Sequence, residues 1–242
     1  MQYLISIALY IFLQVAAFAT PLKDFTAGYD LYHNGMYVGQ TKRRLTTENK
    51  FLTLTSSAET AGLAAIFFDV TITEKSKLRF NNKKLNFFSY SYHEKGSDKN
   101  KAYQLRLDKS QQFYNSYNKE LYPVTSNLHD TLGFTVAIMH DLQSGKRNIK
   151  YTIAEKDKLK IYTLKFIKKE ALSINNEEIS TLKIEHYDPQ AKHRFTFWCA
   201  EDMGFLPIRI RNINHKGDEK LLNLTHFNKE KFYLEMEDEE SY

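Results

Sequence analysis

Cysteine, proline and glycine are all scarce in this chain of 242 residues. It contains one cysteine, Cys199, four prolines and nine glycines. A single cysteine cannot form an internal disulfide, so the fold must depend on packing without cross-links. It also excludes the zinc sites that need paired cysteines. No Pro/Gly/Ser-rich linker and no internal repeat divides the chain, which indicates one domain.

Motifs of common catalytic and metal sites are also missing. The eight histidines show no H-x-x-x-H or H-E-x-x-H spacing, and the chain has no G-x-S-x-G elbow, phosphate loop or G-x-G-x-x-G turn. We therefore expect no catalytic residue, no metal and no cofactor. The chain is predicted not to be an enzyme, with a hydrolase that lacks familiar motifs as the alternative. His186 and His193 fall on neighbouring expected strands and are interpreted as a surface pair.

Long hydrophobic runs occur only at the N-terminus. Residues 3–15 are almost wholly apolar, and Ala17-Phe18-Ala19 has the A-x-A form of a cleavage site. This pattern predicts a signal peptide over residues 1–19, cleaved after Ala19, and a soluble mature protein in a bacterial periplasm. The run is shorter than the about 20 residues that span a bilayer, and an uncleaved anchor is the alternative. No cysteine lies near the cleavage site, so we expect no lipoprotein.

Acidic side chains are outnumbered by basic ones, except at the C-terminus. The net charge is +5 and the isoelectric point is near 9.0. Residues 229–242 form an acidic tail, and the chain before it is correspondingly more basic. Such a surface would attract anionic lipid headgroups or polyanions, although a lysine-rich solvated strand face is the preferred explanation. Without a binding motif, nucleic acid is not an expected partner.

Alternation of apolar and polar residues dominates what is present. The segment "GYDLYHNGMYVGQTK" places Asn34-Gly35 between two alternating stretches, the strongest short signal of a hairpin. Similar stretches recur along most of the chain up to residue 228. We predict a mainly β domain over residues 20–228, a curved antiparallel sheet or half-closed β-barrel of about ten strands. A monomer is expected.

One helix interrupts the strands. Asn127 is a candidate N-cap, and Leu128, Leu132, Val136, Met139 and Leu142 recur at helical spacing. We predict a helix over Asn127–Leu142 that covers the sheet as an adjustable lid.

The stretch "TFWCAEDMGFLPIRI" holds the only tryptophan and the only cysteine. It reads as a hairpin with strands at His193–Ala200 and Phe205–Asn214. Cys199 aligns with Phe195 and Phe197 on one face, where a thiol is usually an inert small hydrophobe, whereas a reactive thiol needs an electropositive, partly exposed site. We predict a structural hairpin.

This hairpin and the N-terminal "YDLYHNGMYVG" resemble the signature of a bacterial family of exported domains of unknown function, the one numbered three thousand one hundred and eight. The shared features are a glycine turn, a tryptophan strand, an acidic turn and a Leu-Pro-Val-Arg-like return strand. In this sequence they correspond to Gly35, Gly39, Trp198, Gly204, Pro207 and Arg209. Gly133 stands where the family has a serine. The resemblance, from Tyr29 to about Phe227, implies an exported β-rich protein with no assigned activity.

Aromatic residues make up 14% of the chain, which fits either an ordinary β core or a hydrophobic pocket. For the second reading, the candidate ligand-binding residues are Phe67, Phe68, Phe88, Tyr90, Tyr92, Lys146 and Arg147. Phe88, Tyr90 and Tyr92 are expected on one strand face under the helix, with Lys146 and Arg147 available for an anionic headgroup. We predict a non-catalytic carrier or binding module for a lipid or hydrophobic ligand, with an envelope structural or interaction protein as the alternative.

Overall fold

The computed structural model describes residues 22–67, 69–81, 84–96, 100–108, 112–125 and 127–229. The predicted signal peptide and the acidic tail beyond residue 229 lie outside these ranges, so both stay predictions. Within the described ranges, no helix is long and apolar enough to cross a membrane.

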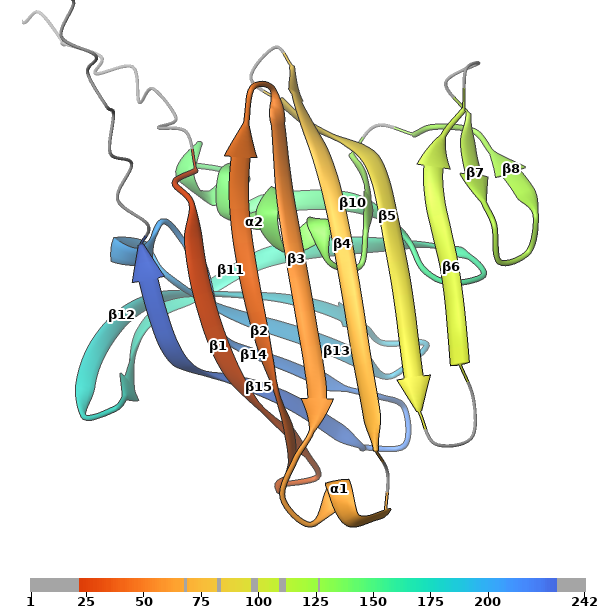
Figure 1. Cartoon of the computed structure of the whole chain (residues 1–242). Coiled ribbons are helices and arrows are strands. Elements are labelled where there is room, and N and C mark those ends of the chain that lie inside the picture. The colour runs from red at the N-terminus through yellow and green to blue at the C-terminus, as the bar shows by residue number, and fades with distance from the viewer. Residues whose placement is uncertain are drawn as a thin grey trace, which may run out of the picture.

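Fifteen strands form one open, curved sheet (Figure 1). They are β1 (Phe25–His33), β2 (Met36–Glu48), β3 (Phe51–Thr60), β4 (Val70–Asn81), β5 (Lys84–Gly96), β6 (Asn100–Leu107), β7 (Phe113–Asn115), β8 (Glu120–Tyr122), β9 (Leu128–Asp130), β10 (Asn148–Ala154), β11 (Leu159–Ile174), β12 (Glu177–Asp188), β13 (His193–Ala200), β14 (Leu206–Ile213) and β15 (Glu219–Lys229). The predicted fold class is confirmed. The count exceeds the expected ten partly because β7, β8 and β9 have only three residues each, too few to show a periodic pattern.

The sheet consists of two meanders that are joined where β1 pairs with β15. Its order is β8-β7-β6-β5-β4-β3-β2-β1-β15-β14-β13-β12-β11-β10-β9, and every pairing is antiparallel except that of β9 with β10. Because β1 pairs with β15, the first and last strands lie side by side in the middle of the sheet. The outermost strands, β8 and β9, are short, and short edge strands offer little backbone to another chain.

The two predicted hairpins are confirmed. Asn34 and Gly35 both have positive φ, 48° and 79°, as the type I′ turn between β1 and β2 requires. The second hairpin joins β13 to β14 through a short 3₁₀ helix, η1 (Glu201–Met203), and Gly204 at φ 67° ends that helix. The predicted strand His193–Ala200 matches β13 residue for residue.

The predicted helix begins six residues too early. Residues 128–130 form β9, which pairs in parallel with β10, and the helix α2 spans Gly133–Gln143. Asn127 is not its N-cap: the side chain of Asn127 donates to the carbonyl oxygen of Lys150. Instead, Oδ1 of Asp130 accepts the backbone N–H groups of Leu132 and Gly133, at 2.9 and 2.7 Å. A buried carboxylate thus satisfies the first donors of α2.

The helix is a central element of the core rather than a lid. It contacts β4 and β5 on one side and β10 and β14 on the other, and every residue from Gly133 to Leu142 is buried. Val136 and Met139 join one hydrophobic cluster, while Phe134 and Ile138 join the other. Figure 1 shows α2 between the two halves of the sheet.

Gly133 permits this close packing and provides no spare room. A Cβ atom at this position would lie 2.3 Å from Oγ of Ser76 and 2.8 Å from Oδ2 of Asp130. Nothing larger than glycine fits there without displacing β4 or the Asp130 cap. The expectation that this helix forms an adjustable lid is therefore wrong.

Cys199 faces the interior of the second hydrophobic cluster, beside Phe195 and Phe197. It is fully buried, and this burial raises the pKa of its thiol.

We expect Cys199 in the native protein to react with a disulfide reagent at least about a hundredfold more slowly than in the urea-unfolded chain, because the thiolate is disfavoured and the sulfur is inaccessible. Spectrophotometric thiol titration measures both rates without ambiguity, since no other cysteine is present. Similar rates in the two states would restore the reactive-thiol interpretation.

Candidate binding site at the mouth of the half-barrel

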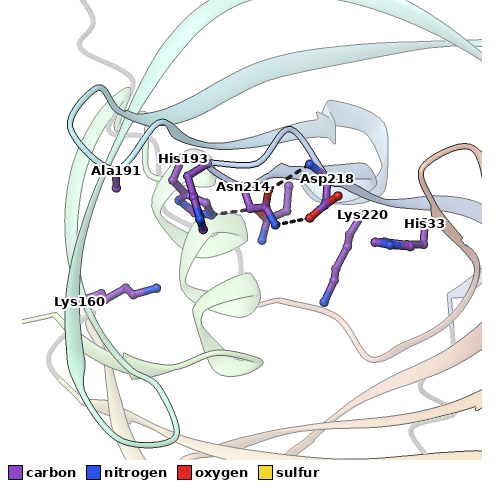
Figure 2. Close-up of a pocket in the computed structure, with 9 residues that line it drawn as sticks. His33, Lys160, Ala191, His193, Asn214, Asp218 and Lys220 are labelled. Atoms are coloured by element: carbon purple, nitrogen blue, oxygen red, sulfur yellow. Dashed lines mark hydrogen bonds between the residues drawn. The ribbon is translucent and has the colours of Figure 1, made fainter.

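A cavity of about 440 Å³ opens at the end of the sheet where β1 and β14 end. We call it the mouth pocket (Figure 2). Its lining residues are His33, Lys160, Ala191, His193, Asn212, Asn214, His215, Asp218 and Lys220. They come from β1, β11, β13, β14, β15 and two turns, so the pocket depends on the curvature of the whole sheet.

Two ammonium groups reach into this pocket. Figure 2 shows Lys160 pointing in from one side, and Lys220 and His33 from the other. Nζ of Lys160 lies 3.0 Å from Oε2 of Glu155. Lys220 has no carboxylate within salt-bridge distance among the described residues, so its charge is available to a ligand.

The single carboxylate of the mouth pocket is already engaged. Oδ2 of Asp218 accepts a hydrogen bond from Nδ2 of Asn214 at 2.9 Å, and Oδ1 accepts one from Nδ2 of Asn34 at 3.5 Å. These amide donors hold the pKa of Asp218 below its usual value. Asp218 therefore stays ionised and fixes the β14–β15 turn, while the lysines and histidines around it make the lining basic.

The histidines of the pocket lie on a layer of aromatic rings. Nε2 of His193 is 2.8 Å from Oδ1 of Asn212, and the ring of His193 stacks on Tyr162 at 6.1 Å between centroids. The ring of His186 also packs on Tyr162, with 4.8 Å between centroids, and it lies 6.3 Å from the ring of His193. His186 is buried, which lowers its pKa. The interpretation of His186 and His193 as a surface pair is wrong for His186, which is buried, whereas His193 is half-buried and lines the pocket.

The described residues contain no group of three or more histidine, cysteine, aspartate or glutamate side chains placed to hold a metal ion. The mouth pocket offers ammonium and imidazole groups for an anion and the amide of Asn212 for a polar substituent.

A model of one protein family matches residues 28–222, which is most of the chain; its description is "Protein of unknown function (DUF3108)". The chain belongs to the DUF3108 family. The resemblance inferred from the two hairpins is thus confirmed. No curated protein matches the DUF3108 chain.

Two solved structures are similar to this DUF3108 protein, and the first supports its fold. A β-barrel-like protein of the domain of unknown function DUF1849 from Brucella abortus aligns at a TM-score of 0.56 and 10% identity, covering 87% of this chain and 99% of that one. A DUF1089 family protein from Pseudomonas aeruginosa aligns at a TM-score of 0.40 and 11% identity, covering 69% and 87%. At 10% identity the Brucella structure supports a β-barrel-like fold and no shared function.

The candidate ligand-binding residues of the DUF3108 chain do not gather in one site. Phe87 and Tyr90 pack inward, whereas Phe88 is 37% exposed on the opposite face. The reason is a β-bulge: Lys77 pairs with Ser89 and Leu78 with Phe87, so Phe88 is an extra residue on β5. The prediction that Phe88, Tyr90 and Tyr92 share a face is therefore wrong for Phe88.

Tyr90 and Tyr92 do face inward, where they serve the core. Their hydroxyls donate to Glu74 and Glu94, at 2.6 and 2.7 Å, and both rings pack on Tyr103. Phe67 belongs to the short helix α1 (Ala64–Phe67), but its side chain and the whole of Phe68 lie outside the described structure.

The two candidate headgroup residues stabilise the C-terminus of α2 instead. Nζ of Lys146 lies 2.7 Å from Oδ1 of Asp141, and Nη1 of Arg147 donates to the carbonyl oxygens of Leu142 and Lys146. Cations at this position satisfy the last carbonyl groups of a helix.

The family signature residues of the DUF3108 protein also stabilise the fold, through close packing and buried hydrogen bonds. Gly39 lies so close to β3 that a Cβ atom would meet the carbonyl oxygen of Glu59 at 2.2 Å. The carbonyl oxygen of Pro207 accepts a hydrogen bond from the buried hydroxyl of Tyr29, at 3.1 Å.

The sequence analysis did not predict the mouth pocket as a site, and no local pattern marks its residues Lys160, Lys220, His33 and Asn212. Only the pair His186 and His193, which the sequence analysis named, lies in this region.

Proposed function

We propose that this protein is an exported, non-catalytic binding module of the bacterial periplasm, and that its ligand carries an anionic group, a phosphate or a carboxylate, held in the mouth pocket. One observation carries the proposal. Two ammonium groups and three histidines surround one cavity, whose single carboxylate is bound by asparagine side chains. Export is supported by the A-x-A pattern before Thr20.

The proposed ligand differs from the hydrophobic one expected under the helix. An acyl chain needs an enclosed apolar cavity, and α2 is buried against both halves of the sheet at the place where that cavity was expected. The mouth pocket is open and polar, which suits a small charged group. The non-catalytic part is supported by the burial of Cys199.

The alternative, an interaction protein of the envelope, has one feature in its favour. β11 pairs with β10 only up to Lys165, so its second half has no described strand on that side. An exposed strand edge accepts an added strand. Lys168 and Lys169 occupy this edge, however, and edge lysines oppose strand addition. We therefore prefer the mouth pocket as the functional site.

We expect Lys220→Gln to weaken binding of inorganic pyrophosphate by about tenfold or more, since a hydrogen bond to a charged group contributes about 1.5–3 kcal/mol. Isothermal titration calorimetry at low ionic strength measures both affinities. The matched control is Lys84→Gln, because Lys84 is an exposed lysine at the start of β5, which does not line the mouth pocket. This variant should bind as the unmodified protein does. Equal affinities for the Lys220 and Lys84 variants, or no binding by the unmodified protein, would refute the proposal.

A further inference from the structure

Two loops beside the mouth pocket expose large apolar side chains to solvent. Met36 and Tyr37, after the β1–β2 turn, are 65% and 38% exposed. Leu63, directly before α1, is 77% exposed, and Ile66, within α1, is 72% exposed. We call these four residues the tip. Figure 1 shows α1 and the β1–β2 turn together at one extreme of the molecule, beyond the strand ends.

The tip is one surface, because the two loops are in contact. The backbone N–H of Ala61 donates to the carbonyl oxygen of Val38, at 3.1 Å. Gly62 lies so close to Tyr37 that a Cβ atom would be 3.2 Å from the Tyr37 ring. From residue 61 to residue 66 the sequence is "AGLAAI", which has no charged or hydrogen-bonding side chain. An apolar run of this kind in an exposed loop indicates a surface that contacts another apolar phase.

The turn that carries the tip is bound to the turn that carries the mouth pocket. The backbone N–H of Asn34 donates to the carbonyl oxygen of Glu219, at 2.9 Å, and the N–H of Glu219 donates to Oδ1 of Asn34, at 2.7 Å. Lys220 follows Glu219 directly. A surface that receives the tip therefore comes close to the free ammonium group of Lys220.

We propose that the tip inserts into the surface of a lipid bilayer and that anionic headgroups of that bilayer are the groups bound by the mouth pocket. This inference rests on the proposed function, because it names the source of the anion. A stable protein interface buries roughly 800 Å² on each partner, far more than four side chains on a projecting tip provide. Insertion into lipid needs only a few exposed aliphatic side chains. Asp69, exposed after the apolar run, limits the depth of insertion.

The test places a reporter in the tip. In Ile66→Trp, the new indole should be quenched by vesicles of brominated phosphatidylglycerol, and its emission should shift to the blue. The only native tryptophan, Trp198, is buried on β13 and gives a constant background. The matched control is Ile161→Trp on β11, a site 56% exposed and outside the tip, where we expect no quenching. Equal quenching of the two variants, or none of Ile66→Trp, would overturn the inference.

Two further changes in the Ile66→Trp protein separate the tip from the pocket. Leu63→Ser should raise the lipid concentration for half-maximal quenching by about tenfold and leave pyrophosphate binding unchanged. Lys220→Gln should raise it by about fivefold on phosphatidylglycerol vesicles and have no effect on phosphatidylcholine vesicles.

If Lys220→Gln weakens pyrophosphate binding but not quenching, the headgroup assignment fails and the proposed function stands. If it changes neither, both fail.

Discussion

Replacing Trp198 with alanine is expected to lower the free energy of unfolding by roughly 3–5 kcal/mol. The indole is only 5% exposed, yet it belongs to neither hydrophobic cluster of the interior, because β13 directs it to the outer face. What buries it is a layer of charged side chains. Lys183, Arg209 and Arg211 lie over the ring, with their charged groups 5.0, 6.0 and 5.5 Å from its centroid.

The indole also anchors a carboxylate. Nε1 of Trp198 donates to Oε1 of Glu170, at 2.6 Å, and Glu170 pairs with Lys168 at 2.7 Å. Alanine would remove the surface on which the cations rest and leave Glu170 without this donor, so packing and polar losses add.

Urea unfolding of three variants tests this account. Trp198→Phe keeps most of the ring and loses the hydrogen bond, so it should cost about 1–2 kcal/mol. Arg209→Ala loses a bond from Nε to Asn223, at 2.7 Å, and should cost about 1 kcal/mol. The expected order of destabilisation is Trp198→Ala, then Trp198→Phe, then Arg209→Ala. A Trp198→Ala protein no less stable than Arg209→Ala would show that the charged layer does not bury the indole.

The second large effect concerns two adjacent buried groups with opposite pH dependence. Burial lowers the pKa of His129 from 6.5 to about 4, and burial raises the pKa of Asp130 from 3.8 to about 6. Asp130 keeps the higher value although Ser76 and two backbone N–H groups donate to it. Nδ1 of His129 has no hydrogen-bond partner among the described residues.

The two contributions to stability have opposite signs between about pH 4 and pH 6. His129 binds fewer protons when folded, so its contribution is full above pH 6.5 and is lost as the pH falls through about 4. Asp130 binds more protons when folded, so its contribution is full below pH 3.8 and is lost as the pH rises through about 6. Each shift of about two pKa units corresponds to about 3 kcal/mol at most, and in the native protein the two largely cancel.

Single variants should reveal the pH dependence of stability that each group contributes on its own. From pH 4 to pH 6, the stability of Asp130→Asn should rise by up to about 3 kcal/mol relative to the unmodified protein, because the His129 contribution is no longer offset. The stability of His129→Phe should fall by a similar amount over the same range. Urea unfolding at a series of pH values gives both curves. Curves parallel to that of the unmodified protein would mean that neither group titrates differently in the folded state.

The sequence predicted those features of the fold that depend on one short segment and missed those that depend on contacts between distant segments. The Asn34-Gly35 turn and the hairpin that contains Trp198 were predicted correctly, because turn residues and alternation lie within one short segment. The start of α2 was missed because Leu128 fits a helical stripe and also pairs with β10, a contact that local spacing does not reveal. The bulge at Phe88 reversed a face assignment in the same way, since one extra residue inverts the alternation.

The mouth pocket was beyond sequence reasoning for a simpler reason. His33 and Lys220 lie on β1 and β15, which pair only because the chain returns to its first strand. Lys160 and His193 reach the same cavity through the curvature of the sheet. Contacts between such distant segments leave no spacing in the sequence, so the candidate site emerges only from the folded chain.

The central claim is that the mouth pocket binds an anion, and the most direct measurement is the acetylation rate of individual lysines, followed by mass spectrometry with and without saturating pyrophosphate. Lys220 should react severalfold more slowly when pyrophosphate is present, because a bound anion covers its ammonium group, while Lys84 should react at the same rate in both samples. Unchanged acetylation of Lys220, or equal protection of Lys220 and Lys84, would contradict the account.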